Sequence, residues 1–343
     1  MEEIDFGEIQ QVLDEILGSG MDFRQMVSQG MQGENLLSVK NLGGLLQRIF
    51  LEELLAQKQL WIHILILAVA AAVLLHFADV FHNKNVSHIS FCMIYMLLFL
   101  LLLTSFRSSM EIAGEVFGHM RDFMTVLAPS YFLAMTLTSY ITSAGVYYEF
   151  ILLLISGVRW FMEAFIMPCI EIYVLLVLAD HLSKEERLTR FTELAEMVVQ
   201  WSLKAALAAV MGFHLIQGVV SPAADAFRNT AVSQGIEMVP GVGDISGSVA
   251  DMVFGSAMLI KNGMGAASLI ALILICLVPL AKLAVIMAAY YVLAAVLQPV
   301  SDERITECLS GMGNAVKLLF QAVFTMLVLF LLTIALTTAL TGR

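Results

Sequence analysis

The sequence predicts an all-α, polytopic membrane protein with roughly six to eight membrane-embedded helices. Hydrophobic residues make up 59% of its 343 residues and charged residues only 14%, whereas soluble domains carry about 25% charged residues. Several uncharged stretches are as long as the about 20 apolar residues that a transmembrane helix needs. We therefore expect the lipid bilayer as its surroundings. The 29 acidic residues outnumber the 18 basic ones, which argues against nucleic acid as a partner.

The N-terminal region, residues 1–59, is acidic and amphipathic, with ten acidic and four basic residues. Apolar residues at helical spacing predict a short amphipathic helix over 5–17, which Gly18 ends. A loop around Gly30 and a second amphipathic helix from Ser38 are expected to follow. The preferred interpretation is a helix pair lying on the membrane surface, and the alternative is a partner-binding domain.

Residues 60–122 are expected to form two membrane spans and a connection. The apolar stretches Leu60–Phe81 and Ile89–Phe106 predict a hairpin of two spans. The next stretch, Arg107–Asp122, contains charged residues of both signs and is predicted to be a polar connection.

The remainder of the chain is predicted to contain an internal duplication. Residues 123–220 form the first half and 240–343 the second, joined by a connection over 221–239. A shift of 117 residues places the apolar run Phe150–Asp180 on Ala267–Leu297. The same shift aligns the charged residues of two polar connections, namely Glu186 and Arg187 with Glu303 and Arg304.

The first element of each half decides how the two halves are related. Phe123–Gly145 opens the first half and 240–262 opens the second. If both cross the bilayer, the halves are inverted; if neither crosses, they are parallel. The apolar run that follows, Gly263–Gln298, would measure about 54 Å as a straight helix, against about 30 Å for the hydrocarbon core. We expect this helix to be bent, tilted or protruding.

A glycine-rich turn followed by a helix opens the second half. An aspartate after the turn is expected to cap the helix, and small residues along it provide a packing face. The helix lines water, packs on neighbouring helices or lies on the bilayer surface, and these alternatives stay open. The residues of this candidate turn and packing motif are Pro240, Gly241, Gly243, Asp244, Gly247 and Gly255.

Five ionisable residues are expected inside the bilayer: Arg159, Glu163, Glu171, Lys204 and Lys282. A charge at mid-bilayer costs at least about 2.5–3.5 kcal/mol, so such side chains normally pair or face water. Arg159 and Glu163 are spaced i,i+4 and can pair on one helix face. Lys282 is expected to pair with Glu163 or Glu171. Internal neutralisation is preferred over a conduction or proton pathway.

We expect no enzyme, and we predict no cofactor or metal site. The sequence contains no HExxH, GxSxG or Walker motif, and its four cysteines are far apart. Gly241–Asp244 matches the GxGD of intramembrane aspartyl proteases, but such an enzyme needs a second aspartate facing the first. Asp180 and Asp225 are the only candidates we consider, and the protease reading is disfavoured.

The second half resembles a known family. The stretches PGVGDISGSVADMVFGSAMLIKNGMG, LVPLAKLA and LQPVSDERITECLSGMGNAVK are similar to the stage III sporulation protein AE family of endospore-forming bacteria. The similarity is clearest from Gly235 to Thr341 and continues more weakly from Ser38.

The resemblance implies a mother-cell membrane protein that faces the forespore. It also implies a role as a non-enzymatic membrane component of the channel complex joining the two compartments. Expected partners are the ring-forming and membrane subunits of that complex, and a homo-oligomer is possible. A transporter or pore in its own right is the main alternative, and a pure scaffold is the second. Family members usually begin with an export signal, which would place residues 1–59 outside the mother-cell cytoplasm, whereas the distribution of Lys and Arg favours the cytoplasmic side.

Overall fold

The computed structural model describes residues 6–17, 22–32, 55, 58–59, 61–66, 69–70, 73, 84–138, 141–182, 188–236, 243–299 and 301–340. In these ranges every regular element is a helix, which confirms the all-α class. The described elements are α1 (Gly7–Leu17), α2 (Phe23–Gln32), α5 (Lys84–Thr138), α6 (Ile141–Phe161), the π-helical turn η1 (Met162–Ile166), α7 (Met167–Asp180), α8 (Thr189–Ile236), α9 (Gly243–Leu297) and α10 (Glu303–Leu340). The predicted span Leu60–Phe81 and the helix expected from Ser38 lie largely outside the described residues.

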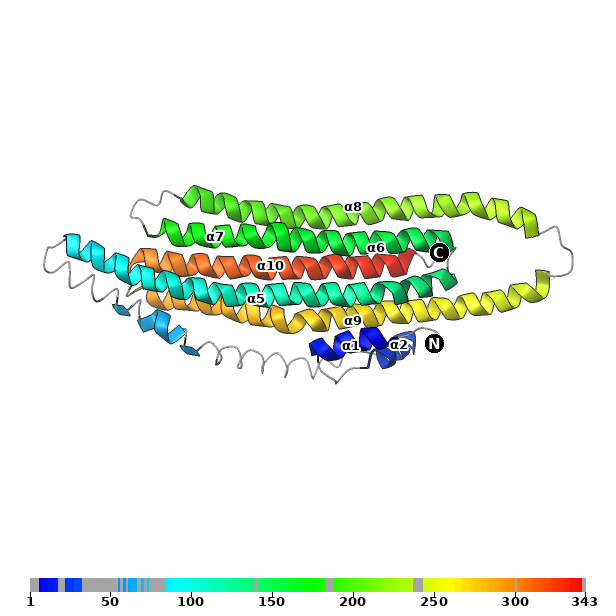
Figure 1. The fold of residues 1–343 in the computed structure, drawn as a ribbon, viewed down its shortest axis with the longest axis horizontal. Helices are drawn as coiled ribbons and strands as arrows, with labels where there is room; N and C mark the ends of the chain where they lie inside the picture. The colour runs from blue at the N-terminus through cyan, green and yellow to red at the C-terminus, as the bar shows by residue number, and fades with distance from the viewer. Residues whose placement is uncertain are drawn as a thin grey trace.

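The long helices lie side by side along one axis (Figure 1). Helices α5, α8 and α10 run in one direction, and the continuous stretch α6–η1–α7 and helix α9 run in the other (Figure 1). Helix α10 occupies the middle of the bundle, because it packs against α5, α7, α8 and α9. The two halves proposed from the sequence therefore run parallel to each other.

The described residues contain five helical segments long and apolar enough to cross a membrane. They are Cys92–Ala134, Tyr148–Asp180, Thr189–Leu215, Met258–Leu297 and Glu303–Thr338. The longest has 43 residues and measures about 65 Å as a straight helix, twice the thickness of a hydrocarbon core. These helices confirm a polytopic membrane protein and extend beyond one bilayer thickness or cross it at a strong tilt.

Helix α5 continues through the stretch that was predicted to be a polar connection. Arg107–Asp122 is helical, so that prediction is wrong. The physical reason is the apolar period of the stretch, since Met110, Ala113, Phe117 and Met120 recur every three or four residues and are buried. Because no connection exists here, its arginines cannot be counted as loop charges when the orientation is inferred.

The two halves share an irregularity at positions that the 117-residue shift relates. Met162 begins η1, and Pro279 lies inside α9. A π-helical turn contains one extra residue, and a proline removes one helical hydrogen bond, so both disturb the regular helix. This correspondence agrees with the duplication, which itself stays a prediction.

Helix α9 passes through Gly263 without a break, so the segment 243–262 continues the apolar run rather than forming a separate helix. At Gly263 the helix is crossed closely by α2. A Cβ atom here would lie 2.6 Å from Met31 Cγ and 2.8 Å from the carbonyl oxygen of Val27. Gly30 faces the same crossing from α2 and belongs to a helix, not to the loop expected around it.

Helix α1 forms over the predicted range and packs with α2 against the bundle. The two helices share a buried apolar face, in which the rings of Phe6 and Phe23 lie 5.7 Å apart. Helix α1 contacts α5 and α9, and α2 contacts α9. The apolar faces of this N-terminal pair are therefore directed at protein helices and not at lipid.

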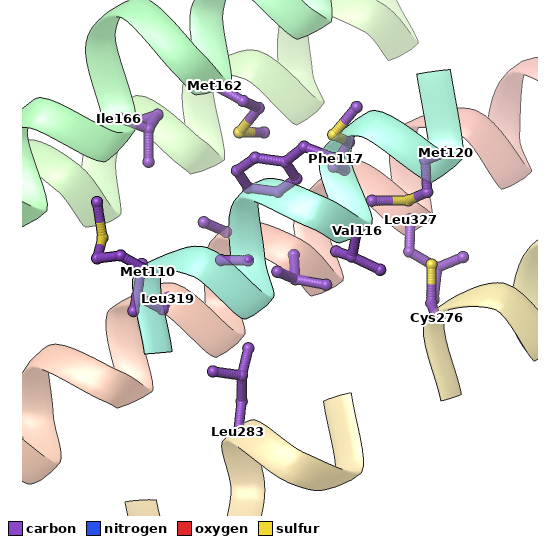
Figure 2. Packing of buried hydrophobic residues seen from close by; sticks show 14 of the residues in the cluster. Met110, Val116, Phe117, Met120, Met162, Ile166, Cys276, Leu283, Leu319 and Leu327 are labelled. Atoms are coloured by element: carbon purple, nitrogen blue, oxygen red, sulfur yellow. The ribbon is translucent and has the colours of Figure 1, made fainter. Parts of the chain in front are cut away.

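The core is formed where α5 lies between η1 on one side and α9 and α10 on the other (Figure 2). Phe117 of α5 points toward Met162 of η1 (Figure 2), and both side chains are fully buried. Leu319 of α10 and Leu283 of α9 belong to the same cluster. Packing of these side chains fixes which face of α5 is turned inward and which is left outside.

Candidate functional site: charged faces of the helix bundle

A cleft of about 540 Å³ opens between α5 and α6. Its charged lining consists of two ion pairs, each formed between residues of one stretch of helix. Arg159 Nε lies 3.0 Å from Glu163 Oε2, and Arg121 Nη2 lies 2.5 Å from Asp122 Oδ1. The remaining lining residues are Thr125, Ile155, Ser156, Trp160 and Ala164.

The local structure explains why Arg159 and Glu163 meet. They are four residues apart across the start of η1, so their side chains project from the same side of the helix. Both remain about two-fifths exposed, and such pairs add only about 0.3–0.5 kcal/mol to stability. In each of the two pairs the carboxylate faces an arginine, which does not give up its proton in proteins. The cleft therefore suits hydration or contact with a polar partner better than proton-transfer chemistry.

The outer side of α5 carries charges that the sequence reading assigned to a connection. Arg107, Glu111 and Glu115 are exposed and follow each other every four residues. We call these three residues the α5 charged face. On the opposite side of the same stretch, apolar residues recur every three or four positions. This spacing in the sequence is the signal that indicates a helix here.

A second polar face runs along α10. Asn314 Oδ1 accepts a hydrogen bond of 2.7 Å from the Tyr291 hydroxyl of α9, and Lys317 is exposed one turn further on. On neighbouring α8, Glu196 accepts a hydrogen bond of 2.9 Å from Gln200 Nε2. This face therefore combines side chains from three helices.

The expected pair of Lys282 with Glu163 or Glu171 is not present. Lys282 is half-buried on α9 and forms no ion pair with any residue that the structure describes. Helices α5 and α10 lie between α9 and the α6–α7 stretch (Figure 1), which keeps the charges apart. Glu171 on α7 and Lys204 on α8 are both exposed. The five predicted charges therefore do not line one path through the chain.

The interior of the bundle near α5, α6 and α10 is closely packed. A cavity between Met124, Tyr131, Ile151 and Thr333 has a volume of about 20 Å³, which is room for a single water molecule at most. In the ranges covered by the structure, no group of three or more His, Cys, Asp and Glu side chains is placed to hold a metal ion.

The candidate turn motif lies partly outside the described residues. Pro240 and Gly241 are not described, and α9 begins at Gly243. The side chains of Asp244 and of residue 247 also lie outside the description. Gly255 is exposed, and nothing lies within 4 Å of a Cβ atom built on it, so none of the described helices packs there.

The two polar connections contain carboxylates that cap the following helices. Asp180 is buried and accepts hydrogen bonds of 2.7 Å from the backbone N–H of Leu188 and from the hydroxyl of Thr189, where α8 begins. Asp302 accepts a hydrogen bond of 3.0 Å from the backbone N–H of Arg304 at the start of α10, and it also pairs with the Arg304 guanidinium. Asp302 is the N-cap residue of α10, whereas Asp180, the last residue of α7, caps the start of α8 from across the turn.

Of the four charged residues predicted in the repeated polar connections, Arg304 is the one that the structure places in this capping arrangement, through Asp302. Glu303 is exposed in the first turn of α10, and Glu186 and Arg187 lie outside the described residues. Since Asp180 is engaged in capping at one end of the bundle and α9 begins near the other (Figure 1), Asp180 cannot face Asp244 as a protease dyad requires.

Comparison with known proteins identifies the family of this chain. The chain matches the sequence profile described as stage III sporulation protein AE (spore_III_AE) over residues 21–341. It is 24% identical over 283 residues to stage III sporulation protein AE of Bacillus subtilis (strain 168), covering 82% of this chain and 71% of the relative. No solved structure matches the chain. The match begins just before α2 and includes all the long helices, so this membrane protein belongs to the stage III sporulation protein AE family.

Proposed function

We propose that the protein is a non-enzymatic, integral membrane subunit of a channel complex that links mother cell and forespore during endospore formation. Family membership supports the sporulation role. The observation that carries the assembly role is the α5 charged face, where Arg107, Glu111 and Glu115 are exposed on a helix of membrane-spanning length. Charges inside a membrane have to be hydrated or matched by another protein surface.

The packed interior favours a subunit over a self-contained transporter. A transporter of small molecules needs a route through the chain that alternately opens to both sides. Here Lys282 and Glu163 are separated by intervening helices, and the cavity lined by Tyr131 and Thr333 measures only about 20 Å³. Arg107, Glu111 and Glu115 instead lie on an outer surface, where other subunits or water between subunits can reach them.

A pure scaffold is the second alternative, and it predicts that charges are neutralised within the chain. Arg159 and Glu163 meet that expectation. Glu111 and Glu115 do not, because neither forms an ion pair in the part of the chain that the structure describes. Exposed, unpaired acidic residues on a long apolar helix support contact with partners or with an aqueous lumen.

The proposal is tested by affinity capture of a tagged chain from sporulating cells after reversible cross-linking, with the host's own copy deleted. The expected result is recovery of ring-forming and membrane subunits of the channel complex, together with restored heat-resistant spores. A fluorescent fusion is expected in the mother-cell membrane around the forespore. Recovery of the chain alone, combined with solute transport by the purified chain in vesicles, would replace the proposal with a transporter.

A further inference from the structure

Two outer surfaces of the bundle carry charges that have no ion-pair partner among the described residues. One is the α5 charged face. The other, here called the α8–α10 face, joins a half-buried carboxylate and a lysine of α8 to a lysine of α10. The two sets are Arg107, Glu111 and Glu115 on the first face, and Glu196, Lys204 and Lys317 on the second.

The two faces point away from different sides of the bundle. Helix α5 packs on α6, α9 and α10, whereas α8 packs on α7 and α10. On α5, the buried Ala113 and Val116 hold the opposite side against the core. On α8, Val199 and Leu203 are the buried residues, and they turn toward α7 and α10. One face cannot therefore neutralise the other within a single chain.

Hydrogen bonds between helices fix the heights of these charges along the bundle. Tyr290 bonds to Ser105 and its neighbour Tyr291 bonds to Asn314, so Ser105 of α5 and Asn314 of α10 lie at nearly the same height. His214 of α8 contacts Thr333 of α10 at 3.4 Å. Because α5, α8 and α10 run in the same direction (Figure 1), residue steps along them can be compared directly.

The charges of the two faces are complementary at matching heights. Relative to the Ser105–Asn314 level, Arg107 lies about 3 Å along the bundle, Glu111 about 9 Å and Glu115 about 15 Å, at 1.5 Å per residue. On the same scale Glu196 lies at about 1.5 Å, Lys317 at about 4.5 Å and Lys204 at about 13.5 Å. When the charges of each face are taken in order of height, the two members of each opposite-sign pair thus differ in height by less than one helical turn.

The outer side of α5 also has space for another helix. Gly114 and Gly118 lie beside the charged face, four residues apart, and nothing lies within 4 Å of a Cβ atom built on either. Glycines at this spacing let the backbones of two membrane helices approach closely. No helix in the described ranges occupies this position, which leaves room there for a helix of a second copy.

We propose that copies of this chain associate head to tail in the membrane, with the α5 charged face of one copy against the α8–α10 face of the next. Copies inserted in the same orientation keep their charges at equal depth, so Arg107 meets Glu196, Glu111 meets Lys317 and Glu115 meets Lys204. Since α5, α8 and α10 run in the same direction within one chain (Figure 1), the α8 and α10 helices of the neighbour run parallel to α5.

A two-fold contact through α5 is disfavoured by the same charges. A two-fold axis along the membrane normal places each residue opposite its own copy at equal depth. Glu111 would then face Glu111, and Glu115 would face Glu115, with like charges at close range. A heterologous interface, in which two different faces meet, avoids this repulsion. The first and last copies each keep one unused face, so the copies form a row, or a ring when these two faces meet. The inference is independent of the identity of the other subunits.

Disulfide trapping between two differently tagged chains tests the interface. The four native cysteines are replaced by alanine, one chain carries Glu115→Cys and the other Lys204→Cys, and both are expressed together in one membrane. The expected product is a disulfide-linked pair containing both tags, and neither variant links to itself. Glu115→Cys combined with Ile172→Cys, on an exposed part of α7, is the control and should give no linked pair.

A second test exchanges the charges of the two faces in chains that keep the native cysteines. The measurement is the mass of the purified assembly by light scattering. Glu111→Lys with Glu115→Lys, or Lys204→Glu with Lys317→Glu, should each reduce the assembled fraction by about tenfold. All four changes in one chain should restore assembly, which a folding defect would not allow, and Glu171→Lys should have no effect. Self-linking of Glu115→Cys, linkage only to a different protein, or failure of the exchange to restore assembly would overturn the proposal.

Discussion

The hydroxyl of Tyr290 on α9 donates a hydrogen bond of 2.6 Å to Ser105 Oγ on α5, and both side chains are buried. This bond joins two residues that are 185 positions apart in the sequence and lie on different helices. The ring of Trp61 also contacts Tyr290 edge-on, with centroids 5.1 Å apart. Tyr290 therefore links parts of the chain from three regions.

Replacing Tyr290 by phenylalanine should destabilise the bundle without changing its packing. The change removes one buried donor, and such hydrogen bonds contribute about 0.5–1.5 kcal/mol in membrane and soluble proteins. Thermal unfolding in detergent, followed by circular dichroism, measures the loss. Ser105→Ala should cost a similar amount, and the double variant should cost little more than either single one, because both remove the same bond.

The close crossing of α2 and α9 at Gly263 predicts a large effect for a side chain there. Gly263→Leu places atoms within 3 Å of Met31 Cγ and of the Val27 carbonyl oxygen, so α2 has to move away. We expect faster proteolysis and faster hydrogen exchange in residues 6–32, with the long helices unaffected. Gly255→Leu is the matched control on the same helix, because nothing lies near that position. Equal proteolysis of the two variants would contradict the crossing.

The errors of the sequence analysis have a common physical origin. Gly30 was assigned to a loop because glycine weakens an isolated helix, whereas here it permits a tertiary contact with Gly263. Arg107–Asp122 was assigned to a connection from its charge, although its apolar period fits one face of a helix. Both assignments depend on what covers the segment, and local composition contains no such information.

The helices after residue 141 could be predicted because their apolar runs are long and bounded by polar turns. The run Phe150–Asp180 lies within α6–α7, and the run Gly263–Gln298 lies almost entirely within α9. The side-by-side order of these helices has no comparable signal in one sequence, and Lys282 was therefore assigned to the wrong neighbours. The two ion pairs of the cleft also required the structure, since Arg121 lay in the supposed connection.

The buried carboxylate of Asp180 predicts a capping defect when it is removed. Asp180→Ala leaves the backbone N–H of Leu188 and the hydroxyl of Thr189 without their acceptor, and loss of such a cap costs about 1–2 kcal/mol. The expected result is a lower unfolding temperature together with faster hydrogen exchange in the first turn of α8. Glu193→Ala is the control: it removes only the exposed ion pair with Arg190 in the same helix and should change both far less.

Phe117 predicts the largest loss of stability. It is fully buried in the core, directed toward Met162 (Figure 2), and truncation of a buried phenylalanine costs about 3–5 kcal/mol. Phe117→Ala should lower the unfolding temperature strongly and reduce the amount of protein in the membrane. Phe324→Ala removes the same atoms from a side chain that is 50% exposed and should have a much smaller effect.

Substitutions of Lys282 distinguish a functional role of its charge from a structural one. It is half-buried in an apolar helix and has no ion-pair partner in the described chain, so Lys282→Leu removes an unfavourable charge and should keep or raise stability, by up to about 2–3 kcal/mol. If the charge serves the assembled complex, the variant accumulates in the membrane at the wild-type level while heat-resistant spores decrease. Lys282→Arg keeps the charge and should retain sporulation. Normal spore formation by Lys282→Leu would show that the charge is dispensable, and loss of the protein from the membrane would show that the lysine is needed for folding.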